Sequence, residues 1–225
     1  MIPLSKTLDL ADFDQLTEEL HVVDARFRDA SEQHPMRRWE YALALHALRY
    51  YETQGIDPHV NLIVDVGGAG SPFWHMLHDE GYPRTQVIDP KENCTLQRYL
   101  RENAALADAV FCISVLEHVK DLDRFCYHLS CLVAPGGLLF LTVDFCDGPT
   151  ILPACTVDDR YHFHWDRQRI FNPYTHGQLT SLFLRRDFEL LGPADFSWHG
   201  THIADDRNMP ETAYTFASLA LIKRP

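Results

Sequence analysis

The stretch Asn61–Pro72 (NLIVDVGGAGSP) decides the fold of this chain. Residues 61–66 form a short apolar run that ends in the glycine-rich segment 67–70, and Ser71 and Pro72 then supply a helix cap and a first-turn residue. This pattern is typical of a buried parallel strand that enters a tight turn and then a helix. Glycines let the backbone pass close to a ligand, and the helix beyond offers free N–H groups to an anion. The turn alone is a weak signal, because glycine-rich turns also serve only to reverse a chain.

The same alternation of short apolar runs and helical segments continues along the chain. Further strands are expected at 86–89, 109–113, 138–143, 188–191 and 214–222, and helices at 73–81, 94–103, 121–133 and 175–186. Strands that alternate with helices predict a parallel sheet with right-handed crossovers. We therefore expect an α/β protein with a Rossmann-like, doubly wound, mostly parallel seven-stranded sheet and an antiparallel edge strand. The segment 8–56 has helical periodicity, and Trp39 and Leu43 are expected to pack a helix on this sheet.

Composition narrows the class of function. The chain has 225 residues and a net charge of −12 with both signs mixed along it, which disfavours a nucleic-acid substrate. We expect no membrane contact, because no apolar run approaches the roughly 18 to 20 residues of a membrane-spanning helix and the first residues do not resemble a signal peptide. The six cysteines lack CxxC spacing, which favours reduced thiols and a cytoplasmic location.

Asp89 ends the second expected strand of the sheet, about 20 residues beyond the glycine-rich turn. A carboxylate at that position can accept hydrogen bonds from both ribose hydroxyls of an adenosine. The alternative is an aspartate that caps the turn before Pro90. Together, the turn and this carboxylate predict a cofactor that contains adenosine.

Two further motifs identify that cofactor. Ser114–Val119 (SVLEHV) follows the strand at 109–113, and Leu132–Leu138 (LVAPGGL) precedes the next strand. With these motifs the sequence resembles the class I S-adenosylmethionine-dependent methyltransferases, in particular the group that includes the ubiquinone and menaquinone methyltransferases. The resemblance covers about residues 60–145. The turn departs from the acidic-x-Gly-x-Gly-x-Gly pattern of that family, because positions 69 and 71 are alanine and serine.

The resemblance also implies the residues that hold S-adenosylmethionine. They are Asp65, Gly67, Gly68, Ala69, Gly70, Asp89, Ser114 and Glu117. The acidic residue and the turn at 67–70 are implied to hold the methionine end, Asp89 the ribose, and Ser114 with its neighbours the sulfonium side. The adenine-binding residue does not follow from the sequence.

The domain organisation follows from the same resemblance. Residues 59–225 are expected to form the methyltransferase domain, with 1–58 as an N-terminal helical cap of that domain. A polar and aromatic stretch at 145–174 is too long for an ordinary connection and is expected to form a lid. Its length and aromatic side chains suggest that it covers the acceptor.

Three histidines are candidates for the catalytic proton acceptor. Methylation of a hydroxyl requires removal of a proton, and histidine is the natural base at neutral pH. His118 lies beside the expected cofactor site, where capping of its helix is the alternative role, and His162 and His164 lie in the expected lid. No metal site is expected, since no carboxylate or cysteine completes a recognisable ligand spacing.

The function expected from the sequence is transfer of a methyl group from S-adenosylmethionine to a small-molecule acceptor, preferably a hydroxyl oxygen, with S-adenosylhomocysteine as product. Two alternatives stay open. The first is a non-catalytic subunit or sensor that binds the same cofactor. The second is an NAD-dependent oxidoreductase, which requires a Gly-x-Gly-x-x-Gly turn that residues 67–73 do not provide. Neither the acceptor nor the oligomeric state follows from the sequence.

Overall fold

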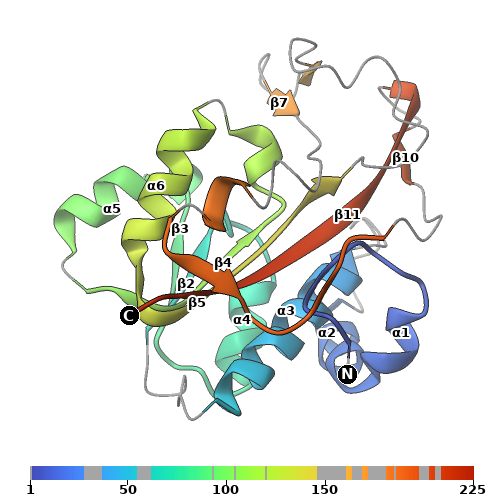
Figure 1. Ribbon diagram of the computed structural model, residues 1–225, viewed down its shortest axis with the longest axis horizontal. Coiled ribbons are helices and arrows are strands. Elements are labelled where there is room, and N and C mark those ends of the chain that lie inside the picture. The colour runs from blue at the N-terminus through green and yellow to red at the C-terminus, as the bar shows by residue number, and fades with distance from the viewer. Residues whose placement is uncertain are drawn as a thin grey trace.

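The computed structural model describes residues 2–27, 37–54, 62–92, 94–103, 105–119, 121–145, 161–163, 169–171, 181–184, 186–197, 203–205 and 209–225. Within these residues one twisted sheet runs through the molecule with helices on both of its sides (Figure 1). Its parallel strands, in spatial order, are β3 (Thr85–Ile88), β2 (Ile63–Val66), β4 (Ala107–Ile113) and β5 (Val133–Phe145). The antiparallel strands are β11 (Met209–Lys223), which pairs with β5, and β8 (Phe188–Leu190) and β10 (Ile203–Asp205), which both pair with β11.

The sheet is buried on both faces because successive residues of its strands alternate between two cores. Ile63 and Phe111 belong to one core, whereas their neighbours Val64 and Val110 belong to the other. The first core is closed by α2 (Thr17–Phe27), α3 (Arg37–Glu52) and α4 (Phe73–Asp79), and the second by α5 (Leu96–Glu102) and α6 (Leu122–Leu132). This arrangement confirms the doubly wound α/β fold.

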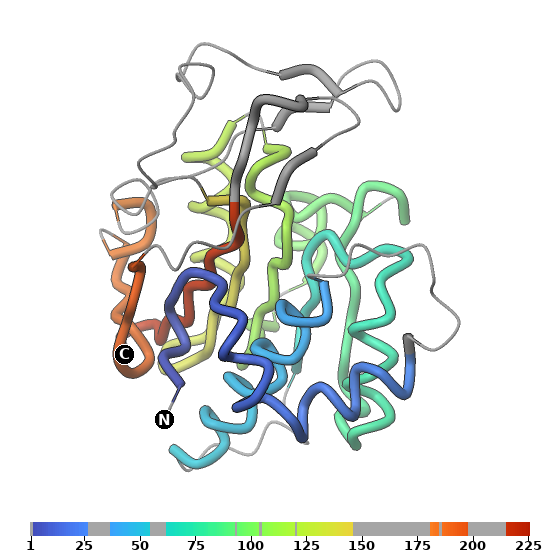
Figure 2. Tube along the Cα trace, turned by 90° about the vertical axis from the view of Figure 1, so that its right-hand side faces the viewer, coloured from blue at the N-terminus to red at the C-terminus, as the bar shows by residue number. Residues whose placement is uncertain are grey.

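The helix α3 packs directly on the sheet. Trp39 and Leu43 are fully buried, as expected from the periodicity of this segment. Helices α2 and α3 lie against each other, as the ribbon view and the tube view both show (Figures 1 and 2). Arg49 of α3 donates to Glu19 of α2 and to Glu80 just beyond α4, so polar contacts also join the three helices.

The N-terminal segment is part of the sheet as well as of the helical layer. The short strand β1 (Ser5–Lys6) pairs in parallel with β9 (Ala194–Asp195), and Thr7 forms a bridge with Ala217 of β11. The one-turn helix α1 (Asp12–Gln15) follows. No helix in the described ranges is long and apolar enough to span a membrane.

Two details differ from the expected arrangement. The antiparallel strand β11 is not an edge strand, because β8 and β10 pair with its outer side. Helix α6 ends at Leu132, before the Pro-Gly-Gly segment, and β5 begins at once with Val133 opposite Ala107. The strand β5 therefore includes the Pro-Gly-Gly segment and is longer than the apolar run at 138–143. Gly136 within it has φ of +77°.

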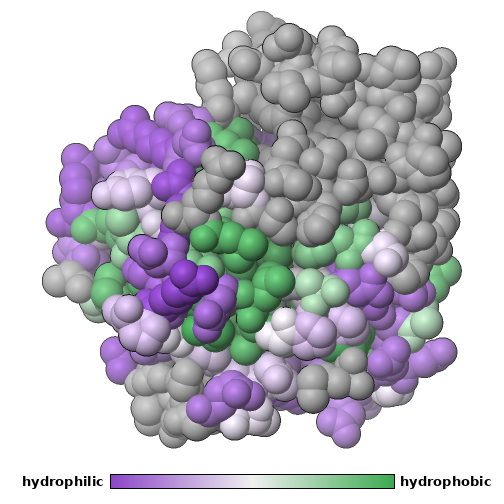
Figure 3. Space-filling view, in the orientation of Figure 1, coloured by the Kyte–Doolittle hydropathy of each residue, from purple (hydrophilic) through white to green (hydrophobic). Residues whose placement is uncertain are grey.

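Apolar side chains gather at the centre of the face shown in Figure 3, and hydrophilic residues dominate the side on which α5 and α6 lie. Exposed apolar surface of this kind is ordinary for a globular protein. The carboxyl ends of β2, β3, β4 and β5 all point to one end of the sheet, because these strands are parallel. Ligands of open α/β sheets bind at that end.

Candidate active site

The glycine turn after β2 packs tightly against neighbouring side chains of the same chain. Gly67 has φ of +86°, and a β-carbon there would lie 2.4 Å from Cγ2 of Val115. A β-carbon on Gly68 would lie 2.0 Å from Oδ2 of Asp65. Gly70 also has a positive φ, of +77°, but faces open space. Glycine is therefore required at 67 and 68 by close contacts with neighbouring side chains, and at 70 by backbone conformation alone.

Asp65 lies beneath this turn and is buried. Its Oδ2 atom has no hydrogen-bond partner among the described residues. Burial, with a smaller contribution from the nearby Asp89, raises the pKa of Asp65 to about 7. A buried carboxyl oxygen without a partner is costly unless a ligand supplies a donor, and the ammonium group of an amino acid is such a donor. The residues present thus fit the methionine end of the expected cofactor.

Asp89 joins two turns. Its Oδ2 accepts a hydrogen bond from the backbone N–H of Ala69 at 3.2 Å, and its Oδ1 accepts one from the N–H of Lys91 at 2.7 Å. This geometry establishes the capping role considered for Asp89. Each carboxylate oxygen has a second lone pair, so capping is compatible with acceptance of a ribose hydroxyl. Ribose binding stays a prediction.

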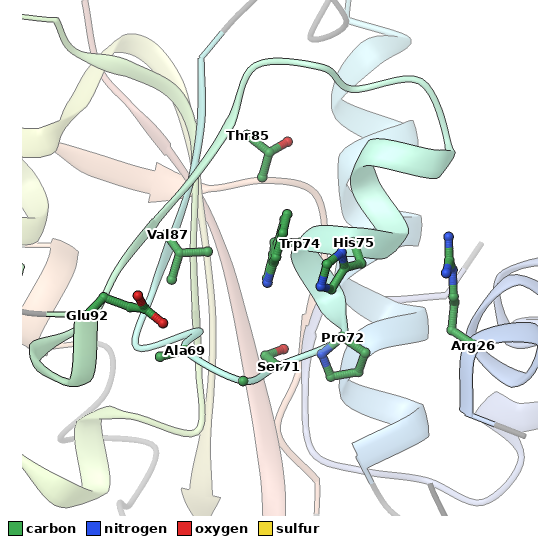
Figure 4. A pocket seen from close by; sticks show the side chains of 10 residues that line it. Arg26, Ala69, Ser71, Pro72, Trp74, His75, Thr85, Val87 and Glu92 are labelled. Carbon is green, nitrogen blue, oxygen red and sulfur yellow. The ribbon is translucent and has the colours of Figure 1, made fainter. Parts of the chain in front are cut away.

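Two pockets flank the glycine turn. The first, which we name the α6-side pocket, has a volume of about 430 Å³ and is lined by Val66, Gly67, Ile88, Leu96, Val115, His118 and Phe125, among others. The second, the α4-side pocket, has about 560 Å³. In Figure 4, Trp74 of α4 lies between Val87 of β3 and His75, and Glu92 lies on the same side as Val87. The α6-side pocket is bordered by the carboxyl ends of β2 and β3.

The 3₁₀ helix η3 (Leu116–His118) directs two consecutive side chains to different surroundings. His118 lines the α6-side pocket. Glu117 is only 1% exposed, and its Oε2 has no hydrogen-bond partner among the described residues. Burial is the main cause that raises the pKa of Glu117 to about 8. The adjacent Glu40 raises this pKa further, and Arg37 lowers it.

Glu40 of α3 connects the helical layer to the ends of two strands. Its Oε1 accepts hydrogen bonds from Oγ of Ser114, at 2.6 Å, and from Oγ1 of Thr142. Its Oε2 forms an ion pair with Nη1 of Arg37 at 2.8 Å. Ser114 has φ of +50°, which is uncommon for a residue other than glycine, and its N–H donates to the carbonyl of Thr142 at 3.1 Å. These contacts hold Ser114, two residues before η3, in this uncommon conformation.

Sequence reasoning did not identify Arg37, Glu40 or Tyr41 as site residues. Tyr41 forms a hydrogen bond of 3.0 Å between its hydroxyl and Oγ of Ser71, at the start of α4. One signal was present in the sequence. Glu40 is a charged residue between two aromatic residues in a helix with a buried face, and such a residue requires partners. The partners themselves are far away in the chain.

The histidines of the expected lid are only partly described. His162 lies in β6 (Tyr161–Phe163), opposite Ile170 of the antiparallel strand β7 (Arg169–Phe171). Strand β7 packs against η3. The structure does not describe the side chain of His162, and His164 lies outside the described residues.

Comparison with known proteins agrees with this geometry. Residues 36–192 match the family described as methyltransferase domain. The chain belongs to this family. The match confirms the class I S-adenosylmethionine-dependent methyltransferase family that the two motifs indicated, and it favours this family over the dinucleotide-dependent alternative.

One curated relative of this methyltransferase is the mitochondrial ubiquinone biosynthesis O-methyltransferase of Rattus norvegicus, 43% identical over 49 residues. That match spans 22% of this chain and 14% of the relative. Among solved structures, the 1,6-didemethyltoxoflavin-N1-methyltransferase of Burkholderia thailandensis, bound to its acceptor and S-adenosylhomocysteine, has a TM-score of 0.55 at 14% identity, over 97% of this chain and 94% of its own. A Clostridium acetobutylicum S-adenosylmethionine-dependent methyltransferase has a TM-score of 0.54 at 8% identity, over 93% and 99% of the two chains. Identities this low show a shared fold alone.

Proposed function

We propose that this protein transfers a methyl group from S-adenosylmethionine to a hydroxyl oxygen of a small molecule. The observation that carries this proposal is the buried carboxyl of Asp65 beneath the glycine turn, whose Oδ2 has no hydrogen-bond partner among the described residues, next to Asp89 at the end of the neighbouring strand. One end of this arrangement suits an ammonium group and the other a ribose, and S-adenosylmethionine contains both.

The α6-side pocket is the proposed site of the adenine ring. Its apolar residues come from the carboxyl ends of β2 and β3, with Val66 and Ile88, and from α5 and α6, with Leu96 and Phe125. A planar ring is held well by such surroundings, with a few polar groups at the rim. Asp89 would bind the ribose, Asp65 and the turn at 67–70 the methionine end, and Ser114 and Glu117 would lie on the sulfonium side. When bound, the cofactor supplies an electrophilic methyl group.

The acceptor is proposed to be a hydroxyl because the site offers several groups that can take a proton. Glu117, with its raised pKa, is one, and His118 of the α6-side pocket is another. His162 and His164 are proposed to join them from the lid. The rat relative is named as an O-methyltransferase, and this supports the choice of oxygen. Since β7 packs against η3, this strand of the proposed lid lies at the same edge of the site as Glu117. A lid there would exclude water from the acceptor.

We place this activity in the cytoplasm. The four cysteines within the described part of the chain, Cys94, Cys112, Cys126 and Cys131, are free thiols, as is usual in a reducing compartment.

The test is calorimetric titration followed by a turnover assay. Purified protein should bind S-adenosylmethionine and S-adenosylhomocysteine with a Kd in the micromolar range, which corresponds to about −7 to −9 kcal/mol. Incubation with methyl-labelled cofactor and a panel of phenols, catechols and aliphatic alcohols should then release S-adenosylhomocysteine. Cofactor binding without release for any acceptor, amines included, would instead favour a non-catalytic binding protein.

A further inference from the structure

Three buried acidic side chains and one arginine meet beside η3. We name Glu40, Glu117, Asp144 and Arg37 the acidic cluster. The three carboxyl residues are at most 5% exposed, and the positive charge of Arg37 is stabilised by its interactions with all three. Asp144 lies near the end of β5 and Glu40 on α3, so the cluster sits between the first core and the carboxyl end of the sheet.

The charges of the cluster do not balance. Within it, one guanidinium faces three carboxyl groups, and the guanidinium is already paired with Glu40 at 2.8 Å. Two acidic groups that share a buried site cannot both ionise freely, and one then holds a proton near neutral pH. Glu117 is that group, because its Oε2 has no hydrogen-bond partner among the described residues, whereas Oε1 of Glu40 accepts two hydroxyl hydrogen bonds and Oε2 of Glu40 is held in the ion pair with Arg37.

The acidic cluster also lies next to the place where the cofactor is proposed to bind. Val115 packs against Gly67, and it connects Ser114 and Glu117 directly to the glycine turn. The adenosine end is proposed to lie in the α6-side pocket and the amino-acid end over Asp65. The sulfur atom that joins these ends must pass this point of the turn. A buried carboxylate acts on a nearby charge more strongly than an exposed one, because its surroundings are poorly polarisable.

We propose that the acidic cluster distinguishes the two forms of the cofactor by charge: the sulfonium of S-adenosylmethionine binds with loss of the proton on Glu117, whereas the neutral thioether of S-adenosylhomocysteine does not displace it. This inference rests on the proposed function. Its consequence is a preference for the methyl donor over the product, and therefore weak product inhibition. Near neutral pH, Glu117 is then ionised mainly when the donor is bound.

Several other charged or titratable groups face Glu117 and set the size of this effect. Arg37 and Glu40 approach it from α3. Tyr41 and Asp144 in turn interact with Arg37. Cys112 approaches from β4, and burial, followed by the charge of Glu117, keeps its pKa well above the ordinary value. Strand β7 carries Arg169, whose side chain lies outside the described part of the structure. Asp65 lies on the other side of the turn.

The test is isothermal titration calorimetry of the full-length protein with S-adenosylmethionine and with S-adenosylhomocysteine, between about pH 6 and pH 9. We expect S-adenosylmethionine to bind about tenfold more tightly near pH 8, a factor that corresponds to about 1.4 kcal/mol. The preference should shrink towards pH 6, where Glu117 keeps its proton. Glu117→Gln should lose most of the preference. Glu102→Gln, which makes the same change at an exposed carboxylate of α5, should retain it.

Proton release provides a second measurement. Titrations in two buffers of different ionisation enthalpy count the protons released when S-adenosylmethionine binds. The cofactor's own α-amino group titrates near these pH values, at about 7.7 to 8.0. The difference between wild type and Glu117→Gln removes that contribution, and wild type should release up to about one proton more.

The outcomes separate the inference from the function. Equal Kd values for both ligands over the whole pH range, with both bound, would overturn the charge discrimination and leave the proposed function intact. Failure of both ligands to bind would overturn the proposed function. If Glu117→Gln does not fold, as judged by circular dichroism, the wild-type data decide alone, and a preference that does not increase with pH contradicts the proposal.

Discussion

Ser114 and Glu40, which are 74 residues apart, are joined by a hydrogen bond of 2.6 Å in which the serine hydroxyl donates to Oε1 of the glutamate. The bond fastens the end of β4 to α3, while Thr142 makes a parallel contact from β5. The N-terminal helical layer therefore determines the conformation from which η3 begins.

Replacing Glu40 should disturb both stability and the site. Glu40→Ala leaves Arg37 without its ion-pair partner and two hydroxyl groups without an acceptor. Loss of one partner of a buried ion pair typically costs about 3 to 5 kcal/mol, and we expect a loss of about 2 to 4 kcal/mol in the free energy of unfolding by urea denaturation. Glu40→Gln retains an oxygen acceptor and should lose less. Equal, negligible losses for both variants would show that these contacts are not stabilising.

Asp89 should contribute to cofactor affinity and to the turn together. Asp89→Ala removes the acceptor of the Ala69 and Lys91 N–H groups and the proposed acceptor of the ribose hydroxyls. Calorimetry should show affinity for S-adenosylhomocysteine reduced by roughly 1.5 to 3 kcal/mol, with the fold retained. Unchanged affinity together with a large drop in thermal stability would mean that Asp89 only caps the turn.

The glycines of the turn should differ in their tolerance of alanine. Gly67→Ala would press a β-carbon against Val115 in a left-handed backbone conformation, and we expect a stability loss of about 2 to 4 kcal/mol. Gly70→Ala adds a β-carbon in open space, so conformational strain of about 1 to 2 kcal/mol remains as its cost. Thermal unfolding measures both. Val115→Ala combined with Gly67→Ala should recover part of the loss, and no recovery would contradict the contact as its cause.

The buried carboxyl groups should make the ligand-free protein less stable at higher pH. Both pKa values are raised on folding, to about 7 for Asp65 and about 8 for Glu117. The native state therefore binds more protons than the unfolded chain between about pH 4 and pH 8, and stability falls as pH rises through this window. Asp65→Asn should remove part of this slope and stabilise the protein by roughly 1 to 3 kcal/mol at pH 8, with little effect near pH 4. Parallel denaturation curves of the two proteins at both pH values provide the measurement.

Replacing the histidines should affect cofactor binding at one position and turnover at the others. His118 lines the α6-side pocket, so His118→Ala should weaken cofactor binding. If His162 or His164 accepts the acceptor's proton, its replacement should cut turnover by about 10²-fold or more, with cofactor affinity nearly intact. Steady-state kinetics with the best acceptor from the panel, combined with cofactor Kd values, distinguishes the two cases. Full turnover in both lid variants would leave His118 and Glu117 as the remaining candidate bases.

Much of the parallel sheet was predictable because its strands are short apolar runs bounded by turns. The carboxyl-end positions of the glycine turn and Asp89 followed from the same pattern, since a residue directly after a parallel strand must lie at that end. The extent of β5 and β11 was not predictable in the same way. β5 includes a proline and two glycines, and β11 begins in a polar segment, so pairing with neighbouring strands extends both beyond their apolar runs.

The sequence by itself determined the doubly wound fold, the family and the carboxyl groups at the cofactor end of the sheet, because local periodicity and short motifs encode them. Only the tertiary structure decided that Glu40 pairs with Arg37 and accepts a hydrogen bond from Ser114, and that Glu117 is buried beside the pocket that His118 lines. The physical reason is that these relations depend on contacts between residues up to 102 positions apart, and on the direction of side chains in a single 3₁₀ turn. No local sequence pattern predicts the long-range contacts or the side-chain directions.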